Sequence, residues 1–277
     1  MSEFRSKKIV SNFIWKLAER WGAQLVTFVV QLILARILEP SVYGVIALIQ
    51  VFINCSMVLV DAGLGTALIQ KKGADEKDFS TVFWANCVIC SGIYVIFWLV
   101  SPAIARAYEI ADLSLYMRVL GISVLIGGIK NIQQAYVSKH MMFKKFFFAT
   151  LAGTLCAGVI GVWMAMNGYG IWALIGQQLI NMGIDTLVLW FTVKWRPERY
   201  FSKTKFQELF SYGWKILLSS FIDTLYGNLS QLMIGKVYDS ESLAFYSQGQ
   251  KFPNLIITNI NSSIDSILLP TMSEAQD

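Results

Sequence analysis

Residues 79–104 read FSTVFWANCVICSGIYVIFWLVSPAI, and this stretch carries no acidic or basic side chain. A helix of about 20 mostly apolar residues is long enough to cross the hydrocarbon core of a bilayer. Similar segments recur along the 277 residues, of which 55% are hydrophobic and 15% charged, with a mean hydropathy of +0.53. Soluble domains usually carry about 25% charged residues. The sequence therefore predicts an all-α polytopic membrane helical bundle without a large soluble domain.

Long apolar runs separated by charges, proline or glycine predict eight membrane spans. The predicted spans are 12–38, 42–60, 79–104, 115–138, 146–166, 169–193, 210–237 and 243–269. Tight breaks at 39–41 (EPS) and 167–170 (NGYG) predict helical hairpins.

Basic residues are distributed unequally between alternate connections. Fourteen lie before the first span or in even-numbered connections, against Arg106 alone in the odd-numbered ones. The fourteen are Arg5, Lys7, Lys8, Lys71, Lys72, Lys77, Lys139, Lys144, Lys145, Lys194, Arg196, Arg199, Lys203 and Lys205. The positive-inside rule therefore predicts a cytoplasmic N-terminus. Because the net charge of +5 comes from residues spread between apolar runs, it reports topology and does not indicate nucleic-acid binding.

An internal repeat becomes visible when the sequence is shifted by 200 residues. The shift aligns Gln31 with Gln231, Arg36 with Lys236, Glu39 with Asp239, Gln50 with Gln250 and Asn54 with Asn254. Six spans separate the two copies, so the repeats are predicted to be parallel, as in two-lobed transporters. We expect a first six-helix lobe at 1–193, a basic cytoplasmic linker at 194–209 and the first two helices of a second lobe at 210–277. A complete second copy would need about 200 residues after Leu209, so the chain is expected to be the front part of a longer protein.

Polar side chains recur at helical spacing inside the predicted spans. Charged groups in hydrocarbon cost about 2.5–3.5 kcal/mol, so they normally face a protein interior or a wet cavity. The residues predicted to line such a cavity are Lys16, Arg20, Gln24, Gln31, Gln50, Asn54, Lys215, Asp223, Lys251 and Asn254. Hydrogen bonding between helices is the alternative for the amides, and snorkelling to the membrane surface is the alternative for Lys16 and Arg20.

Asp61 at the end of the second predicted span and Lys130, Asp185 and Asp265 inside later spans are candidates for an ion relay. Two interpretations of Lys130 and Asp185 stay open, because the pair would serve equally as a structural bridge or in proton or ion transfer. Glycine or alanine at 153, 157 and 161 predicts close helix packing. The four cysteines lie in apolar runs and are interpreted as small buried residues, so neither a metal nor a cofactor is expected.

The most specific motif is LARILEPSVYG at 34–44, followed by DAGLG at 61–65, ALIQKK at 67–72 and FWAN at 83–86. With these motifs the chain resembles Wzx-type flippases, which move lipid-linked oligosaccharides for O-antigen, capsule and exopolysaccharide assembly. Among them it is similar to the colanic acid and teichuronic acid exporters. The resemblance implies a MATE-like fold in the multidrug/oligosaccharidyl-lipid/polysaccharide superfamily and a location in the bacterial cytoplasmic membrane. It also implies an undecaprenyl-pyrophosphate-linked sugar repeat as substrate, with a polysaccharide polymerase and glycosyltransferases of the same pathway as partners.

A flippase of this kind needs cations near the pyrophosphate and amides near the sugars. Lys16, Arg20, Lys215 and Lys251 are the expected cations. A small-molecule or drug cation antiporter of the same fold is the alternative function. A membrane-embedded polysaccharide polymerase is less favoured, because the sequence shows no recognisable pair of nucleophile and base. The protein is therefore expected not to be an enzyme.

Overall fold

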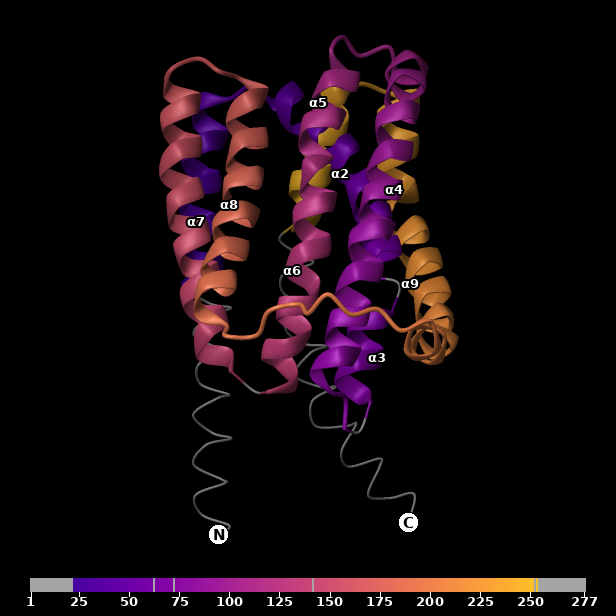
Figure 1. Cartoon of the computed structure of the whole chain (residues 1–277). Coiled ribbons are helices and arrows are strands. Elements are labelled where there is room, and N and C mark those ends of the chain that lie inside the picture. The colour runs from indigo at the N-terminus through magenta and orange to yellow at the C-terminus, as the bar shows by residue number, and fades with distance from the viewer. Residues whose placement is uncertain (1–21, 62, 72, 141, 252, 254–277) are drawn as a thin grey trace, which may run out of the picture.

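The computed structural model describes residues 22–61, 63–71, 73–140, 142–251 and 253, and these residues form a helical membrane bundle (Figure 1). A 22–37 helix precedes α2 (Pro40–Asp61), α3 (Leu64–Gln70), α4 (Glu76–Tyr108), α5 (Leu113–Leu120), α6 (Ile122–Lys139), α7 (Phe143–Met166), α8 (Ile171–Thr192), α9 (Lys203–Val237) and a 240–251 helix. No strand occurs in the described part of the chain. The prediction of an all-α polytopic bundle is confirmed.

Four stretches of the described residues are long and apolar enough to cross a membrane: Pro40–Ile69, Glu76–Tyr108, Leu113–Lys139 and Lys144–Met166. The shorter apolar helix Gly22–Ile37 belongs to the first predicted span. Helices α8 and α9 lie at two further predicted positions but are not among these four stretches, and α8 carries Gln177 and Asp185. The eight-span count stays a prediction, and the last predicted span lies largely outside the described residues.

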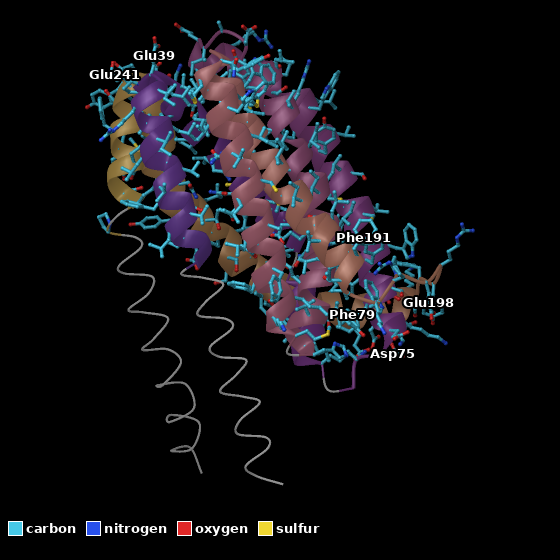
Figure 2. The ribbon with its side chains drawn as sticks, turned by 90° about the vertical axis from the view of Figure 1, so that its left-hand side faces the viewer. Glu39, Asp75, Phe79, Phe191, Glu198 and Glu241 are labelled. Carbon is cyan, nitrogen blue, oxygen red and sulfur yellow. The ribbon has the colours of Figure 1, made fainter. Side chains whose placement is uncertain are left out.

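The connections gather at two ends of the bundle. Residues 73–75, which precede α4, and the segment between α8 and α9 lie at one end, which we call the linker end (Figure 1). The 167–170 turn and the turn between α4 and α5 lie at the opposite end, which we call the turn end (Figure 1). Figure 2 shows Glu39 and Glu241 at the turn end, with Asp75 and Glu198 at the linker end. Loops that the distribution of basic residues assigned to opposite sides of the membrane therefore lie at opposite ends of the bundle.

The predicted linker 194–209 is docked on the bundle rather than separated from it. Residues 193–202 cross the linker end as an extended segment, and α9 already begins at Lys203. Trp195 is 4% exposed, and its ring stacks on Tyr136 with centroids 5.6 Å apart. The Trp84 indole donates a hydrogen bond to the Glu198 carbonyl at 2.8 Å. Aromatic packing thus holds the segment against α4 and α6.

Ion pairs add a second attachment between the linker and the α3–α4 loop. Lys205 Nζ lies 2.8 Å from both carboxylate oxygens of Asp75 and 3.1 Å from Asp78 Oδ1. Lys71 Nζ lies 3.2 Å from Glu208 Oε2 and 3.4 Å from Asp78 Oδ1. We call these five residues the linker clasp. The hydrogen bond from Lys205 is the main cause that lowers the pKa of Asp75 to about 2.

The clasp is expected to make stability depend on pH in the acid range. The folded-state pKa of Asp75 lies below the unfolded value of about 3.9, so the stabilisation is present above that value and is lost as pH falls towards 2. The Asp75 side chain is 53% exposed, so screening limits the contribution to about 0.2–1 kcal/mol. Asp75→Asn, which keeps a side chain suited to the N-cap, should lower the thermal stability of the full-length protein in detergent at pH 7 and flatten its loss between pH 5 and 2.5. Glu241→Gln at the turn end is the control, and identical acid profiles for the two variants would contradict the assignment.

Candidate functional site

A buried ion pair joins α6 to α8. Lys130 Nζ lies 2.5 Å from Asp185 Oδ2, and the two side chains are 17% and 7% exposed. The second carboxylate oxygen, Asp185 Oδ1, is buried and has no hydrogen-bond partner in the described part of the chain. The structure therefore brings these two predicted residues into contact, in a location where an unpaired charge would be costly.

A polar pocket of about 340 Å³ lies beside this ion pair, between α2, α3, α6 and α8. The Asn131 amide donates a hydrogen bond to Asp61 Oδ1 at 2.7 Å. Gly65 makes room for this pair, since a Cβ there would lie 3.0 Å from Asp61 Oδ1. The other polar residues that line the pocket are Thr66, Lys130, Gln134 and Ser138. Sequence reasoning missed Asn131, although Asn131 lies three residues before Gln134 and therefore shares a helix face with it.

Small residues in α7 accommodate the polar stripe of α8. A Cβ at Gly153 would lie 2.8 Å from the carbonyl oxygen of Asn181, and a Cβ at Gly161 would lie 3.0 Å from Gln177 Cβ. The intervening Ala157 is also buried. The predicted close packing at 153, 157 and 161 is confirmed, and it positions Asp185 towards α6.

A second pocket, of about 290 Å³, lies between the 22–37 helix and the 240–251 helix. Its lining includes three predicted cavity residues, Gln24, Gln31 and Lys251, together with Gln248. The Tyr43 hydroxyl is buried at this pocket without a hydrogen-bond partner among the described residues. Apolar residues that line it are Phe28, Leu32, Ala35, Leu38, Pro40, Ala244 and Phe245. We call it the amphiphilic pocket, because amide and ammonium groups share it with a hydrocarbon wall.

The other predicted cavity residues have different surroundings. Gln50 and Asn54 hydrogen-bond to each other along α2 at 2.9 Å and line neither of these two pockets. Lys215 and Asp223 are exposed on α9 and also lie outside both. The predicted residues Lys16, Arg20, Asn254 and Asp265 lie outside the described part of the chain. Three of the predicted cavity residues, Gln24, Gln31 and Lys251, thus line one pocket, and helical spacing alone did not show which faces meet.

The fold and the buried charges define a polytopic membrane protein with polar sites between its helices. Residues 33–277 match the polysaccharide biosynthesis protein family, and the chain belongs to that family.

Several relatives carry names from bacterial polysaccharide pathways. Teichuronic acid biosynthesis protein TuaB of Bacillus subtilis (strain 168) is 25% identical over 222 residues, which cover 79% of this chain and 46% of that protein. Succinoglycan biosynthesis transport protein ExoT of Rhizobium meliloti (strain 1021) is 21% identical over 97% of this chain and 54% of its own length. Lipopolysaccharide biosynthesis protein WzxC of Escherichia coli (strain K12) is 24% identical over 93% of this chain and 54% of its own length.

These matches confirm the resemblance to Wzx-type proteins. The chain spans about half the length of the relatives it matches. No solved structure gives a significant match.

Proposed function

We propose that the protein moves undecaprenyl-pyrophosphate-linked oligosaccharide repeat units across the bacterial cytoplasmic membrane by alternating access, with the linker end and the N-terminus in the cytoplasm. The observation that carries this proposal is the amphiphilic pocket, which combines three glutamine amides, one lysine and an apolar wall. A lipid-linked oligosaccharide needs the same combination, because its headgroup is polar and anionic while its polyprenyl chain stays in hydrocarbon. Family membership points to the same class of substrate.

Different residues of the pocket suit the phosphate groups and the sugars of such a headgroup. The Lys251 ammonium supplies positive charge for a phosphate group, and the buried hydroxyl of Tyr43 is available as a donor. Gln24, Gln31 and Gln248 supply amides suited to sugar hydroxyls. The predicted cations Lys16 and Arg20 would add to the pyrophosphate site. These are binding roles without a catalytic residue, in keeping with a transporter rather than an enzyme.

The polar pocket between α2, α3, α6 and α8 is proposed as the place where ion movement is coupled to transport. Asp61 and Asp185 are carboxylates on different helices, and Lys130 lines the pocket while it pairs with Asp185. With Asp265 they form the proposed ion relay. The physical support is the location of ionisable groups among apolar helices, which in membrane proteins commonly marks an ion path.

A small-molecule antiporter remains the second candidate, because about 290 Å³ lies at the lower end of the range for drug-sized ligands. Export of a labelled organic cation by the full-length protein, in place of lipid-linked sugar, would favour it.

Lys251→Ala tests the proposed headgroup site. In a flippase-deleted host complemented with the full-length gene, surface polysaccharide per folded molecule should fall about tenfold or more, because one charge-assisted hydrogen bond is worth about 1.5–3 kcal/mol. Lys251→Arg should retain part of the activity. Lys203→Ala is the matched control, since Lys203 is likewise an exposed lysine but lies outside both pockets. Normal polysaccharide from Lys251→Ala at normal membrane abundance would reject the cationic pocket.

A further inference from the structure

A third pocket, of about 410 Å³, lies between the start of α7 and the last turn of α8. We call it the hairpin pocket. The residues that line it are Met142, Lys144, Lys145, Phe148 and Thr192. None of them lines the amphiphilic pocket or the polar pocket. The transport sites proposed above therefore leave the hairpin pocket without a role.

The hairpin pocket lies at the boundary between the membrane and the solvent at the linker end. The apolar span Lys144–Met166 begins at the pocket, and α8 ends there, before the extended segment 193–202. Figure 1 shows α7 and α8 side by side at one edge of the bundle. Phe148 is 50% exposed and Phe191 is 80% exposed, and Figure 2 shows Phe191 on the outer surface near the linker end. Apolar surface next to the pocket is thus open to lipid.

Two lysines supply positive charge at the pocket. Lys145 Nζ donates a hydrogen bond to the Thr192 carbonyl oxygen at 2.6 Å, which fixes the ammonium at the end of α8. An ammonium carries three N–H donors, so one hydrogen bond does not exhaust its capacity. Lys144 Nζ lies 5.9 Å from the centroid of the Phe148 ring, so the second charge lies beside an aromatic wall. The pocket therefore presents cations and a hydrocarbon surface to the same ligand.

Carboxylates are missing from this part of the sequence. No acidic residue occurs between Asp112 and Asp185, and the lining of the hairpin pocket contains none. The segment after α8 adds Lys194 and Arg196 before its first acidic residue, Glu198. An anionic ligand complements these charges, whereas a ligand with a positive group would meet like charges.

We propose that the hairpin pocket binds an anionic glycerophospholipid of the surrounding leaflet, with its phosphate beside Lys144 and Lys145 and its acyl chains along Phe148 and the exposed surface of the hairpin. Basic pockets between membrane helices are typical sites for anionic lipid headgroups. The volume of about 410 Å³ falls in the usual range for small-ligand sites. The proposal requires only that the linker end lies at a membrane surface, and it does not depend on which substrate is transported.

A lipid titration of the delipidated full-length protein in a non-ionic detergent tests the site. Dioleoylphosphatidylglycerol is the probe, and bound lipid is counted by native mass spectrometry. Lys144→Gln with Lys145→Gln removes both charges, and the new amide at position 145 keeps a donor for the Thr192 carbonyl. This variant should bind the lipid about tenfold or more weakly, because each lysine near an anionic headgroup contributes a factor of about five.

Lys77→Gln with Lys203→Gln is the matched control. Both lysines are exposed at the linker end outside the hairpin pocket, and Lys77 also lies over an aromatic ring, that of Tyr200. Equal losses of affinity in the two double variants would overturn the site, since general surface charge would then explain binding. If the first double variant does not fold, Lys144→Gln alone leaves the hydrogen bond from Lys145 intact. That single variant should bind about fivefold more weakly, and unchanged affinity would equally refute the proposal.

Two competitors distinguish a phospholipid from other sources of phosphate. sn-Glycerol 3-phosphate at millimolar concentration should not displace the lipid, because it lacks acyl chains, and displacement would show a site for soluble phosphates instead. Undecaprenyl phosphate that binds at Lys144 and Lys145 while phosphatidylglycerol does not would assign the pocket to the lipid carrier and contradict the proposal. Loss of the proposed transport function with unchanged phosphatidylglycerol binding would reject the proposed substrate and leave this site in place.

Discussion

Asp185→Ala is expected to reduce the amount of folded full-length protein in the membrane severely. The substitution leaves the Lys130 ammonium, which is 17% exposed at the polar pocket, without the carboxylate that lies 2.5 Å away. Removing one partner of a buried pair typically costs about 3–5 kcal/mol, because the remaining charge stays desolvated. Membrane-integrated protein is measured by quantitative blotting and by the midpoint of thermal aggregation in detergent. Asp223→Ala, which removes an exposed carboxylate from α9, is the control and should have little effect.

A double substitution separates the two interpretations of this pair. Lys130→Met with Asp185→Leu removes both charges, so it should restore folding to near the wild-type level. If the pair is only a structural bridge, polysaccharide export should recover together with folding. If the pair belongs to an ion relay, folded protein should accumulate without export. Wild-type abundance of Asp185→Ala alone would show that the ion pair contributes little to the fold.

The sequence predicted the helical architecture well, because hydrophobic spacing and length determine where a chain can cross a bilayer. Helices α2, α4, α7 and α8 coincide closely with predicted spans. The prediction was less accurate at the start of α9, where Ser202 caps the helix and places its first residue at Lys203. Capping depends on one side-chain hydrogen bond, which hydropathy does not detect.

The sequence predicted which candidate site residues share a helix face. It did not predict which residues of other helices they contact. Gln24 and Gln31 share a face by spacing, yet their position opposite Lys251 depends on how two distant helices cross. The spacing of Gln50 and Asn54 had equally suggested a cavity, but the Gln50 amide donates a hydrogen bond to Asn54 Oδ1 one turn away. Side-chain pairing within one helix and across helices gives the same sequence pattern, so only tertiary packing distinguishes them.

The sequence alone could not predict backbone contacts between glycines that lie far apart in the chain. One of these contacts, between Gly63 and Gly213, allows a test of how α9 is attached to the bundle. Gly63 has φ +66° at the start of α3, and a Cβ there would lie 2.9 Å from both the carbonyl carbon and the Cα of Gly213 in α9. Gly73 has a similar φ of +74°, but a Cβ there would meet nothing within 4 Å. The two positions therefore share the conformational requirement for glycine and differ only in the contact with α9.

Gly73→Ala should cost only the left-handed backbone penalty, about 1–2 kcal/mol. Gly63→Ala should cost that penalty plus about 1–3 kcal/mol, because α9 must shift to admit the methyl group. Denaturant unfolding of the full-length protein in detergent measures both losses. Limited proteolysis at the basic segment 194–205 should accelerate in Gly63→Ala alone, since displacement of α9 pulls Lys205 away from Asp75. Equal destabilisation by the two substitutions, with unchanged proteolysis, would mean that the contact between Gly63 and Gly213 does not hold α9 against the bundle.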